Sequence, residues 1–363
     1  MSYQQMKTIL SQFRWEGDPI RCERYGNGHI NETYIVETDV HHCYILQKIN
    51  KHVFHDIEGL MHNIIAVTDY LHRNNPDPRH VLTLIPTQDS KKFYLAIDGE
   101  CWRAYEFITD SICLDHPENE NDLRQSGIAF GQFQNQLADF PAHTLIQIIP
   151  GFHDTPVRFQ HLSEAIKADR VGRLSGCAKE IDWYLKQESK AGSLIDLLDH
   201  EQLPLRVTHN DTKLNNVMLD RKNRTPLCVI DLDTIMPGLA AYDFGDSIRF
   251  GASTASEDEK DLSKVTLSLS LYKAYTEGFL SACGKRLTLL EKETLPLGAR
   301  IMTLECGVRF LTDWLNGDQY FHISYPEQNL DRARTQMKLV QDMDQKWNQL
   351  YNILRKTQSY ALH

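Results

Sequence analysis

The stretch of residues 205–254 constrains this chain more than any other, because it holds two short apolar runs that are each followed by a polar loop. Runs of Val, Ile and Leu bounded by Asn, Asp, Gly and Pro are typical of buried strands. Such strands form a rigid platform, and groups with chemical roles gather on the loops that the platform holds. We therefore expect the chemistry of the chain in the loops at residues 209–216 and 231–233.

The first loop reads HNDTKLNN and the second begins DLD. Asp211, Asn216 and Asp231 follow one another in the order in which kinase-like phosphotransferases carry a catalytic base, a metal-binding amide and a metal-binding carboxylate. A carboxylate can orient an attacking hydroxyl group and accept its proton, and Mg²⁺ prefers hard oxygen ligands. Any one of these residues could simply form a turn, but the set at matching offsets predicts a base at Asp211 and metal ligands at Asn216 and Asp231.

The motifs HNDTKLNN, VIDLDT and YDFGDSIRFGAST resemble those of the aminoglycoside phosphotransferase and choline kinase family. A narrower resemblance, to the members that phosphorylate N-acetylhexosamines, extends from YGNGHINETY to YPEQNLDRARTQMKLVQ. The resemblance implies ATP and Mg²⁺ as cofactors. It also implies transfer of the γ-phosphoryl group to the anomeric hydroxyl of GlcNAc or GalNAc.

The same resemblance implies an α+β, protein-kinase-like bilobal fold with a small β-sheet lobe and a larger, mainly helical lobe. A length of 363 residues is typical of about two domains. We therefore expect a nucleotide-binding lobe at residues 1–108 and a catalytic and sugar-binding lobe at residues 109–363.

A glycine-rich turn near the start of the chain is the expected cover of the nucleotide phosphates. Gly26 and Gly28 stand between two strand-like runs, and glycine allows backbone N–H groups to approach phosphates closely. The same Gly-Asn-Gly sequence is also typical of a plain hairpin turn. The resemblance implies that His29, Asn31 and Thr33 face the phosphates.

The next strand departs from the protein kinase pattern. Where those enzymes carry a phosphate-pairing lysine, this chain has Gln47, and Lys48 should point to the opposite face because side chains alternate along a strand. Lys213 is our candidate for the missing cation, with a solvated loop lysine as the alternative. Glu58 is a possible acidic partner on the helix expected at residues 57–71, although a surface glutamate is the commoner case.

Acidic and capping residues near the central stretch give further expectations. Asp233 is a candidate for the metal shell or the acceptor site, whereas Asp243 and Asp246 are expected to tie the following loop to the large lobe. Ser256 followed by Glu259 is a capping-box signature, which predicts that a helix begins there and runs through LSKVTLSLSLYKAYTEGFLSA.

The acceptor side is expected in the segment RFLTDWLNGDQYF. The resemblance implies that Arg309 and Tyr320 contact sugar hydroxyl groups, alongside Asp211 and Asp231. The structural alternative for Arg309 is an ion pair with a carboxylate, as is usual for an arginine directed into an interior.

Composition excludes several other functions. The net charge of −10 and the pI of about 5.9 argue against a nucleic-acid surface. No stretch approaches about 20 uninterrupted apolar residues, so we expect a cytoplasmic protein that does not enter membranes. The eight dispersed cysteines favour reduced thiols over disulfides or a zinc site. The expected partners are a small sugar and ATP, and the expected state is a monomer.

Two alternatives stay open at this stage. A kinase for another small hydroxylated acceptor, such as another hexose, choline, homoserine or an aminoglycoside, would keep Asp211, Asn216 and Asp231 and change the acceptor pocket. A nucleotide-binding regulatory module is the other alternative, because Gln47 stands in place of lysine. The sequence decides neither between GlcNAc and GalNAc nor the oligomeric state.

Overall fold

The computed structural model describes residues 3–26 and 30–360. The chain divides into two compact units, and each is assembled from three separate segments. The first unit contains Met1–Ile112, Asp139–Pro150 and Met218–Pro237, and the second contains Cys113–Ala138, Gly151–Val217 and Gly238–His363. The assignment of nucleotide binding to residues 1–108 and of catalysis to residues 109–363 stays a prediction.

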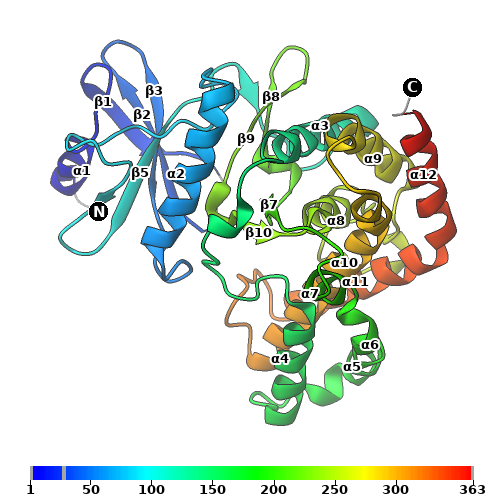
Figure 1. The fold of residues 1–363 in the computed structure, drawn as a ribbon. Coiled ribbons are helices and arrows are strands. Elements are labelled where there is room, and N and C mark those ends of the chain that lie inside the picture. Colours follow the sequence, from blue (N-terminus) through cyan, green and yellow to red (C-terminus); the bar gives the residue numbers. More distant parts are fainter. Residues whose placement is uncertain (1–2, 27–29, 361–363) are drawn as a thin grey trace. The chain divides into compact units, whose positions relative to one another are not determined.

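The first unit is organised around an antiparallel five-stranded sheet of order β1-β2-β3-β5-β4 (Figure 1, blue to cyan). Its strands are β1 (Pro19–Arg24), β2 (Glu32–Thr38), β3 (Cys43–Lys48), β4 (Tyr94–Leu95) and β5 (Cys101–Glu106). Helices α1 (Tyr3–Leu10) and α2 (Ile57–Asn74) belong to the same unit, and α2 includes the helix expected at residues 57–71.

The two faces of this sheet differ in chemistry because side chains alternate along each strand. Tyr44 and Leu46 of β3 and Trp102 of β5 join the apolar cluster that buries Phe13. Gln47 and Arg103, which are paired in the β3–β5 register, alternate with these residues and so belong to the other face. The expected alternation of Gln47 and Lys48 is therefore confirmed.

A second, smaller sheet and a short turn complete the first unit. The sheet has the order β6-β8-β9 and consists of β6 (Ser111–Ile112), β8 (Val217–Asp220) and β9 (Pro226–Val229). The chain then forms the 3-10 turn η4 (Leu232–Thr234) and the short strand β10 (Met236–Gly238). Asp231, the first residue of the predicted second loop, caps this turn.

The second unit is mainly helical (Figure 1). Its longer helices are α3 (Glu120–Gln136), α4 (Thr155–Ala168), α8 (Ala240–Gly251), α9 (Leu269–Cys283), α10 (Leu289–Asn316), α11 (Gln328–Gln345) and α12 (Trp347–Tyr360). Shorter elements are α5 (Ala178–Leu185), α6 (Glu188–Ala191), α7 (Ser193–Asp199) and the strand β7 (Arg206–Thr208). Helix α3 packs on α9, and α10 packs on α8, α11 and α4.

The prediction that a helix begins at Ser256 is wrong. Helix α9 begins only at Leu269, where the Ser268 hydroxyl oxygen accepts a hydrogen bond from the Leu271 backbone N–H. The intervening segment is held by contacts with other helices instead, because Glu257 pairs with Arg249 of α8 and Asp258 accepts a hydrogen bond from Gln328 of α11 at 2.8 Å. A complete capping box does occur, at Thr288 and Glu291, where it begins α10.

The predicted α+β fold class is confirmed, with an antiparallel sheet in the first unit and helices in the second. Across residues 3–26 and 30–360, the structure contains no helix of the length and apolarity needed to span a bilayer. All eight cysteines are unpaired thiols, of which Cys113 is exposed rather than buried.

Candidate active site

The loop at residues 209–216 leaves β7 and is pinned to the second unit from its first residue. His209 is fully buried, and its ring lies edge-on to Phe130 and Phe133. The Asp243 carboxylate, in the first turn of α8, accepts the backbone N–H groups of His209 at 3.0 Å and Asn210 at 2.9 Å. Asn210 has a φ of 64°, a left-handed conformation that a residue without glycine's freedom adopts only where neighbouring contacts hold it.

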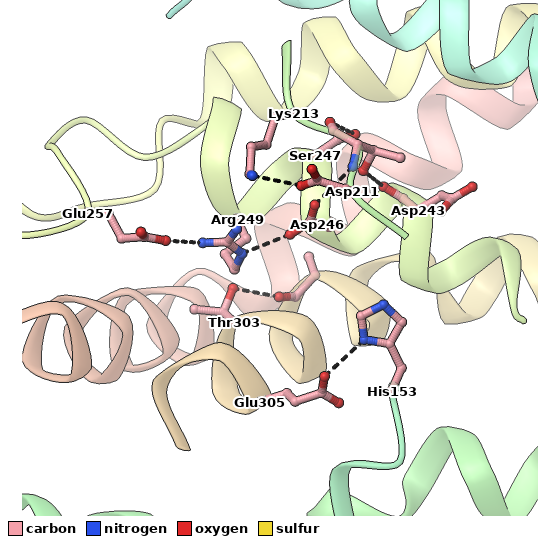
Figure 2. Close-up of polar contacts among 12 residues, drawn as sticks. His153, Asp211, Lys213, Asp243, Asp246, Ser247, Arg249, Glu257, Thr303 and Glu305 are labelled. Atoms are coloured by element: carbon pink, nitrogen blue, oxygen red, sulfur yellow. Dashed lines mark hydrogen bonds and ion pairs between the residues drawn. The ribbon is translucent and has the colours of Figure 1, made fainter. Parts of the chain in front are cut away.

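Helix α8 also holds the middle of this loop (Figure 2). Asp246 accepts the Thr212 backbone N–H at 3.0 Å, and its other oxygen binds Arg249 at 2.9 Å. The Ser247 hydroxyl donates to the Thr212 carbonyl oxygen at 2.9 Å. Asp243 and Asp246 therefore anchor the loop that precedes them in the chain. The following loop, which we expected them to hold, is tied to Asp246 indirectly, because Arg249 bonds both Asp246 and Glu257.

Three of the predicted site residues lie together in this loop. Lys213 Nζ is 2.8 Å from Asp211 Oδ1, and Figure 2 shows the two side chains directed at each other. The Asn216 amide nitrogen donates to Asp211 Oδ2 at 3.1 Å and to its backbone oxygen at 2.8 Å. The Asp211 side chain keeps about a quarter of its surface exposed, at 26%. This carboxylate is thus oriented by two neighbours and still reachable by a substrate.

The ion pair sets the charge state of the loop. Burial raises the pKa of Asp211, but the Lys213 ammonium, together with the bond from Asn216, more than offsets this and leaves the pKa below its ordinary value. Asp211 in turn raises the pKa of Lys213. Both groups are therefore charged at neutral pH, as a proton acceptor and a phosphate-binding cation need to be.

The turn that carries Asp231 belongs to the first unit. Asp231 has a φ of 60° and a ψ of 59°, a left-handed conformation that is unfavourable for an aspartate. The carbonyl oxygen of Ile235 accepts from the Asn63 amide of α2 at 2.9 Å, and the Asp233 carboxylate pairs with Arg103 at 2.5 Å. The turn is thus fastened at two points to the same unit.

The glycine-rich segment is described only in part. Gly26 has a φ of 73°, which suits a tight turn, whereas Gly28 and His29 lie outside the described residues. Asn31 donates its amide to Asp233 Oδ2 at 2.5 Å, and the Thr33 hydroxyl oxygen accepts from Gln47 at 3.1 Å. Both side chains therefore join a network, Asn31 with the turn that carries Asp231 and Asp233, and Thr33 with β3.

Gln47, which stands where protein kinases carry a lysine, contacts Arg103, a residue that the sequence analysis did not identify. Gln47 Oε1 accepts two hydrogen bonds from Arg103, at 3.0 and 2.9 Å. Arg103 supplies a fixed positive charge next to Gln47, from the adjacent strand β5. Glu58, the possible acidic partner, is exposed in the first turn of α2. Strand alternation could have flagged Arg103, since a charged residue stands there among the apolar residues of a buried strand.

Arg309 and Tyr320 are brought together in the second unit. Arg309 Nη2 lies 3.4 Å from the Tyr320 hydroxyl, and the guanidinium carbon lies 5.5–5.6 Å from the ring centres of Phe152, Tyr320 and Phe321. Glu305, one turn earlier on α10, does not pair with Arg309. Its carboxylate accepts a hydrogen bond from the Thr155 hydroxyl at 2.7 Å and contacts the buried imidazole of His153 (Figure 2). The surroundings of Arg309 are therefore aromatic, and Tyr320 is 65% exposed.

The two predicted magnesium ligands belong to different units, Asn216 to the second and Asp231 to the first. Asn216 and Asp231 offer an amide oxygen and carboxylate oxygens, the hard ligands that Mg²⁺ takes. Among residues 3–26 and 30–360, no three His, Cys, Asp or Glu side chains gather as a metal site.

Comparisons with known proteins agree with this chemistry. A model of the phosphotransferase enzyme family matches residues 21–264, which is more than half of the chain. The matched range contains Asp211, Asn216 and Asp231.

Solved structures match over nearly the whole chain. A microcompartment-associated aminopropanol kinase has a TM-score of 0.57 at 15% identity and covers 96% of this chain and 98% of its own. An aminoglycoside phosphotransferase from Alicyclobacillus acidocaldarius has a TM-score of 0.60 at 11% identity, with 96% of each chain covered. A choline kinase from Cryptosporidium parvum Iowa II has a TM-score of 0.57 at 14% identity, covering 94% and 93%. At these identities the likeness concerns the fold, and it confirms the predicted protein-kinase-like class.

Proposed function

Since the chain belongs to the phosphotransferase enzyme family, we propose that it transfers the γ-phosphoryl group of ATP to a hydroxyl group of a small molecule. The observation that carries this proposal is the Asp211 carboxylate, held between Lys213 and Asn216 on a loop that α8 fixes in place. Positioning of this kind is the main contribution that a protein makes to phosphoryl transfer.

Asp211 is the proposed catalytic base. Its pKa lies below the ordinary value, so the carboxylate is ionised at neutral pH and can accept the proton of the acceptor hydroxyl. The acceptor oxygen then forms its bond to the γ-phosphorus while the bond from that phosphorus to the bridging β–γ oxygen breaks and ADP leaves. Lys213, drawn toward the phosphates, is the proposed cation that stabilises the charge developing there.

Asn216 and Asp231 are the proposed holders of Mg²⁺. When bound, the ion neutralises charge on the phosphate oxygens and aligns them for transfer. The chain contributes the orientation of these ligands: Asp211 accepts from the Asn216 amide nitrogen, which fixes which end of that amide faces the base, and the turn around Asp231 is fastened through Asp233.

Replacement of the base tests the proposal. Asp211→Asn keeps the shape of the side chain and removes its ability to take a proton, so we expect kcat to fall by about 10²–10⁴. Binding of ATP and the melting temperature should stay close to wild type. ADP release is measured with MgATP and the preferred acceptor, and a variant that turns over at the wild-type rate would remove Asp211 from the mechanism.

For the acceptor, we propose the anomeric hydroxyl of an N-acetylhexosamine, GlcNAc or GalNAc, as in an N-acetylhexosamine 1-kinase. The support is the resemblance of the sequence motifs together with the cluster of Arg309, Tyr320, Phe152 and Phe321. Aromatic faces suit the C–H surfaces of a sugar ring, and a guanidinium group suits its hydroxyl and carbonyl oxygens. An anomeric hydroxyl is more acidic than an ordinary alcohol, so a carboxylate is an adequate base.

A kinase of amino alcohols or aminoglycosides is the second candidate, favoured by the similar fold of enzymes that act on aminopropanol, choline and aminoglycosides. One observation weighs against choline. A quaternary ammonium group binds in a cage of aromatic rings, and the rings of Phe152, Tyr320 and Phe321 are already engaged by the guanidinium group of Arg309.

A panel of acceptors separates these possibilities. We expect MgATP to be converted to ADP in the presence of GlcNAc or GalNAc, with the phosphate found on C1 by ³¹P NMR. Turnover only with aminopropanol, choline, homoserine or an aminoglycoside would replace the sugar by that acceptor. ATP binding without turnover on any acceptor would favour a nucleotide-binding regulatory module.

A further inference from the structure

The side chain of Arg103 is buried in the first unit, with 1% of its surface exposed. Burial of an arginine is very unfavourable unless its charge is paired and its N–H groups are bonded. Its Nη1 lies 2.5 Å from Asp233 Oδ1, and Nε and Nη2 both donate to Gln47 Oε1. Because nearly all of its surface is covered, Arg103 meets its partners within the unit rather than a ligand.

The two partners of Arg103, Gln47 and Asp233, are themselves bonded to the segment after the glycine-rich turn. Gln47 passes the contact on by donating to the Thr33 hydroxyl at 3.1 Å, and Asp233 accepts from Asn31 at 2.5 Å. One guanidinium group thus links the residues after the glycine-rich turn, the strand β3 and the turn that carries Asp231. All of these residues belong to the first unit.

The turn at Asp231 needs such a brace. Asp231 adopts the left-handed conformation, which aspartate tolerates better than most residues with a Cβ but which still costs more than it does for glycine. Asp233 stands two residues later in the same turn, so the pair with Arg103 limits how far the turn can relax. The ion pair therefore contributes to holding the turn in which Asp231 lies.

We propose that Arg103 is a positioning residue, which orients the turn at residues 231–235 that carries the proposed metal ligand Asp231. The fixed cation of this sheet then lies on β5, whereas protein kinases carry a lysine on β3, at the position of Gln47. The acidic partner of this cation is Asp233. Glu58, the helix residue considered for that role, is exposed. This inference rests on the proposed function, because Asp231 is a metal ligand only in a phosphotransferase. Arg103 acts through the turn and makes no contact with the phosphates.

The test removes the ion pair without leaving a buried charge. In Arg103→Met/Asp233→Asn the methionine occupies a similar volume, and the asparagine can still accept from Asn31. Replacement of a buried ion pair by neutral groups is often neutral for stability, so we expect the double variant to fold. The melting temperature of the metal-free protein, with hydrogen exchange of the 231–235 turn, checks the fold and shows whether that turn has loosened.

The decisive measurement is the affinity of Mn²⁺ for the complex of protein and ATP, followed by electron paramagnetic resonance. Loss of a group that orients a metal ligand weakens metal binding by about 10–100-fold, and we expect a change of that size in the double variant. Affinity for ATP in EDTA should stay near wild type, and so should the KM for the acceptor. If Arg103 had a purely structural role, the double variant would be less stable than wild type but would bind Mn²⁺ with the same affinity.

Lys48→Met is the matched control. Lys48 is the next residue on β3, faces the other side of the sheet and pairs with Glu100 at 3.1 Å. The substitution removes a cation from the same strand, so its Mn²⁺ affinity should equal that of wild type. Arg103→Lys, which keeps the charge for Asp233 but loses the paired bonds to Gln47, should fall between wild type and the double variant.

Three outcomes decide the matter. A folded double variant with wild-type Mn²⁺ affinity overturns the proposal. If the double variant does not fold, Gln47→Met takes its place, because it leaves the ion pair intact and releases Arg103 from β3; a smaller loss of Mn²⁺ affinity is expected, and wild-type affinity overturns the proposal. If Mn²⁺ fails to bind the wild-type protein with ATP, the proposed function itself is wrong, which is a separate result.

Discussion

At the level of single residues, the chemistry proposed for Asp211 depends on the ammonium group two positions along the chain. Asp211 has a lowered pKa, so its ionisation stabilises the fold above the ordinary value of about 3.9, and this contribution is lost as the pH falls through the lowered pKa of the folded protein. Lys213 has a raised pKa, so its contribution is lost only as the pH rises above about 10.4. The pair is intact across the range in which enzymes work.

Lys213→Met should change the pH profile of the reaction. Without the ammonium group, burial of Asp211 is opposed only by weaker contacts, so its pKa rises. We expect the acidic limb of kcat/KM to move to a higher pH than in wild type. The profile is measured between about pH 5 and 9, with Lys264→Met, a change at an exposed lysine, as the control. Coincident acidic limbs would contradict the pairing described here.

Arg309→Ala tests the acceptor side. Loss of hydrogen bonds from a charged group costs about 1.5–3 kcal/mol, so the KM for the sugar should rise roughly 10–100-fold while the KM for ATP is unchanged. Steady-state kinetics with each substrate varied in turn measures both constants. A lowered melting temperature with an unchanged sugar KM would assign Arg309 to the packing of Phe152 and Phe321 instead.

At the level of elements, α8 supports the loop at residues 209–216, and the position of α8 depends on α10. The two helices approach so closely that a Cβ atom added at Gly245 would meet the Gly298 backbone, and one added at Gly298 would meet the Ala241 backbone. Since Asp243 and Asp246 project from α8 and bond the loop at residues 209–216, a shift of this helix would displace Asp211.

Gly298→Ala should therefore weaken both stability and turnover. Overpacking of this kind costs about 1–3 kcal/mol, which a urea unfolding series can resolve. Gly176→Ala is the matched control, because nothing lies within 4 Å of a Cβ added at Gly176. It should be neutral or slightly stabilising, by up to about 1 kcal/mol. Equal stability of the two variants would mean that the α8–α10 contact can relax freely.

At the level of the whole molecule, the two compact units carry different parts of the proposed chemistry. The first contains the sheet, Arg103 and the turn with Asp231, and the second contains the loop with Asp211 and the acceptor cluster around Arg309. A ligand that binds the folded chain stabilises it by mass action, so nucleotide binding can be detected without knowing the acceptor.

MgATP should raise the melting temperature. At 100 times the dissociation constant the gain is about 2.7 kcal/mol, which corresponds to a rise of several degrees. The rise should be largely lost in EDTA and kept in Asp211→Asn, because the proposed base is not a metal ligand. Thermal scans with and without Mg²⁺ measure it, and an equal rise in EDTA would argue against a metal-dependent nucleotide site.

The α+β fold class was implied by the resemblance of the sequence motifs to a known family. From its local pattern, the sequence by itself determined the strand that begins at Cys43, the helix that begins at Ile57 and the loop that unites Asp211, Lys213 and Asn216. These features follow from alternation, helical periodicity and turn-forming residues, which depend only on near neighbours in the chain. The helix start expected at Ser256 failed because long-range contacts, such as that of Asp258 with Gln328, outweighed a local signal. Only the tertiary structure decided that Asp243 and Asp246 hold the preceding loop and that Arg103 stands beside Gln47, 56 positions away. Contacts of that kind depend on strand register and helix packing, which a single sequence does not reveal.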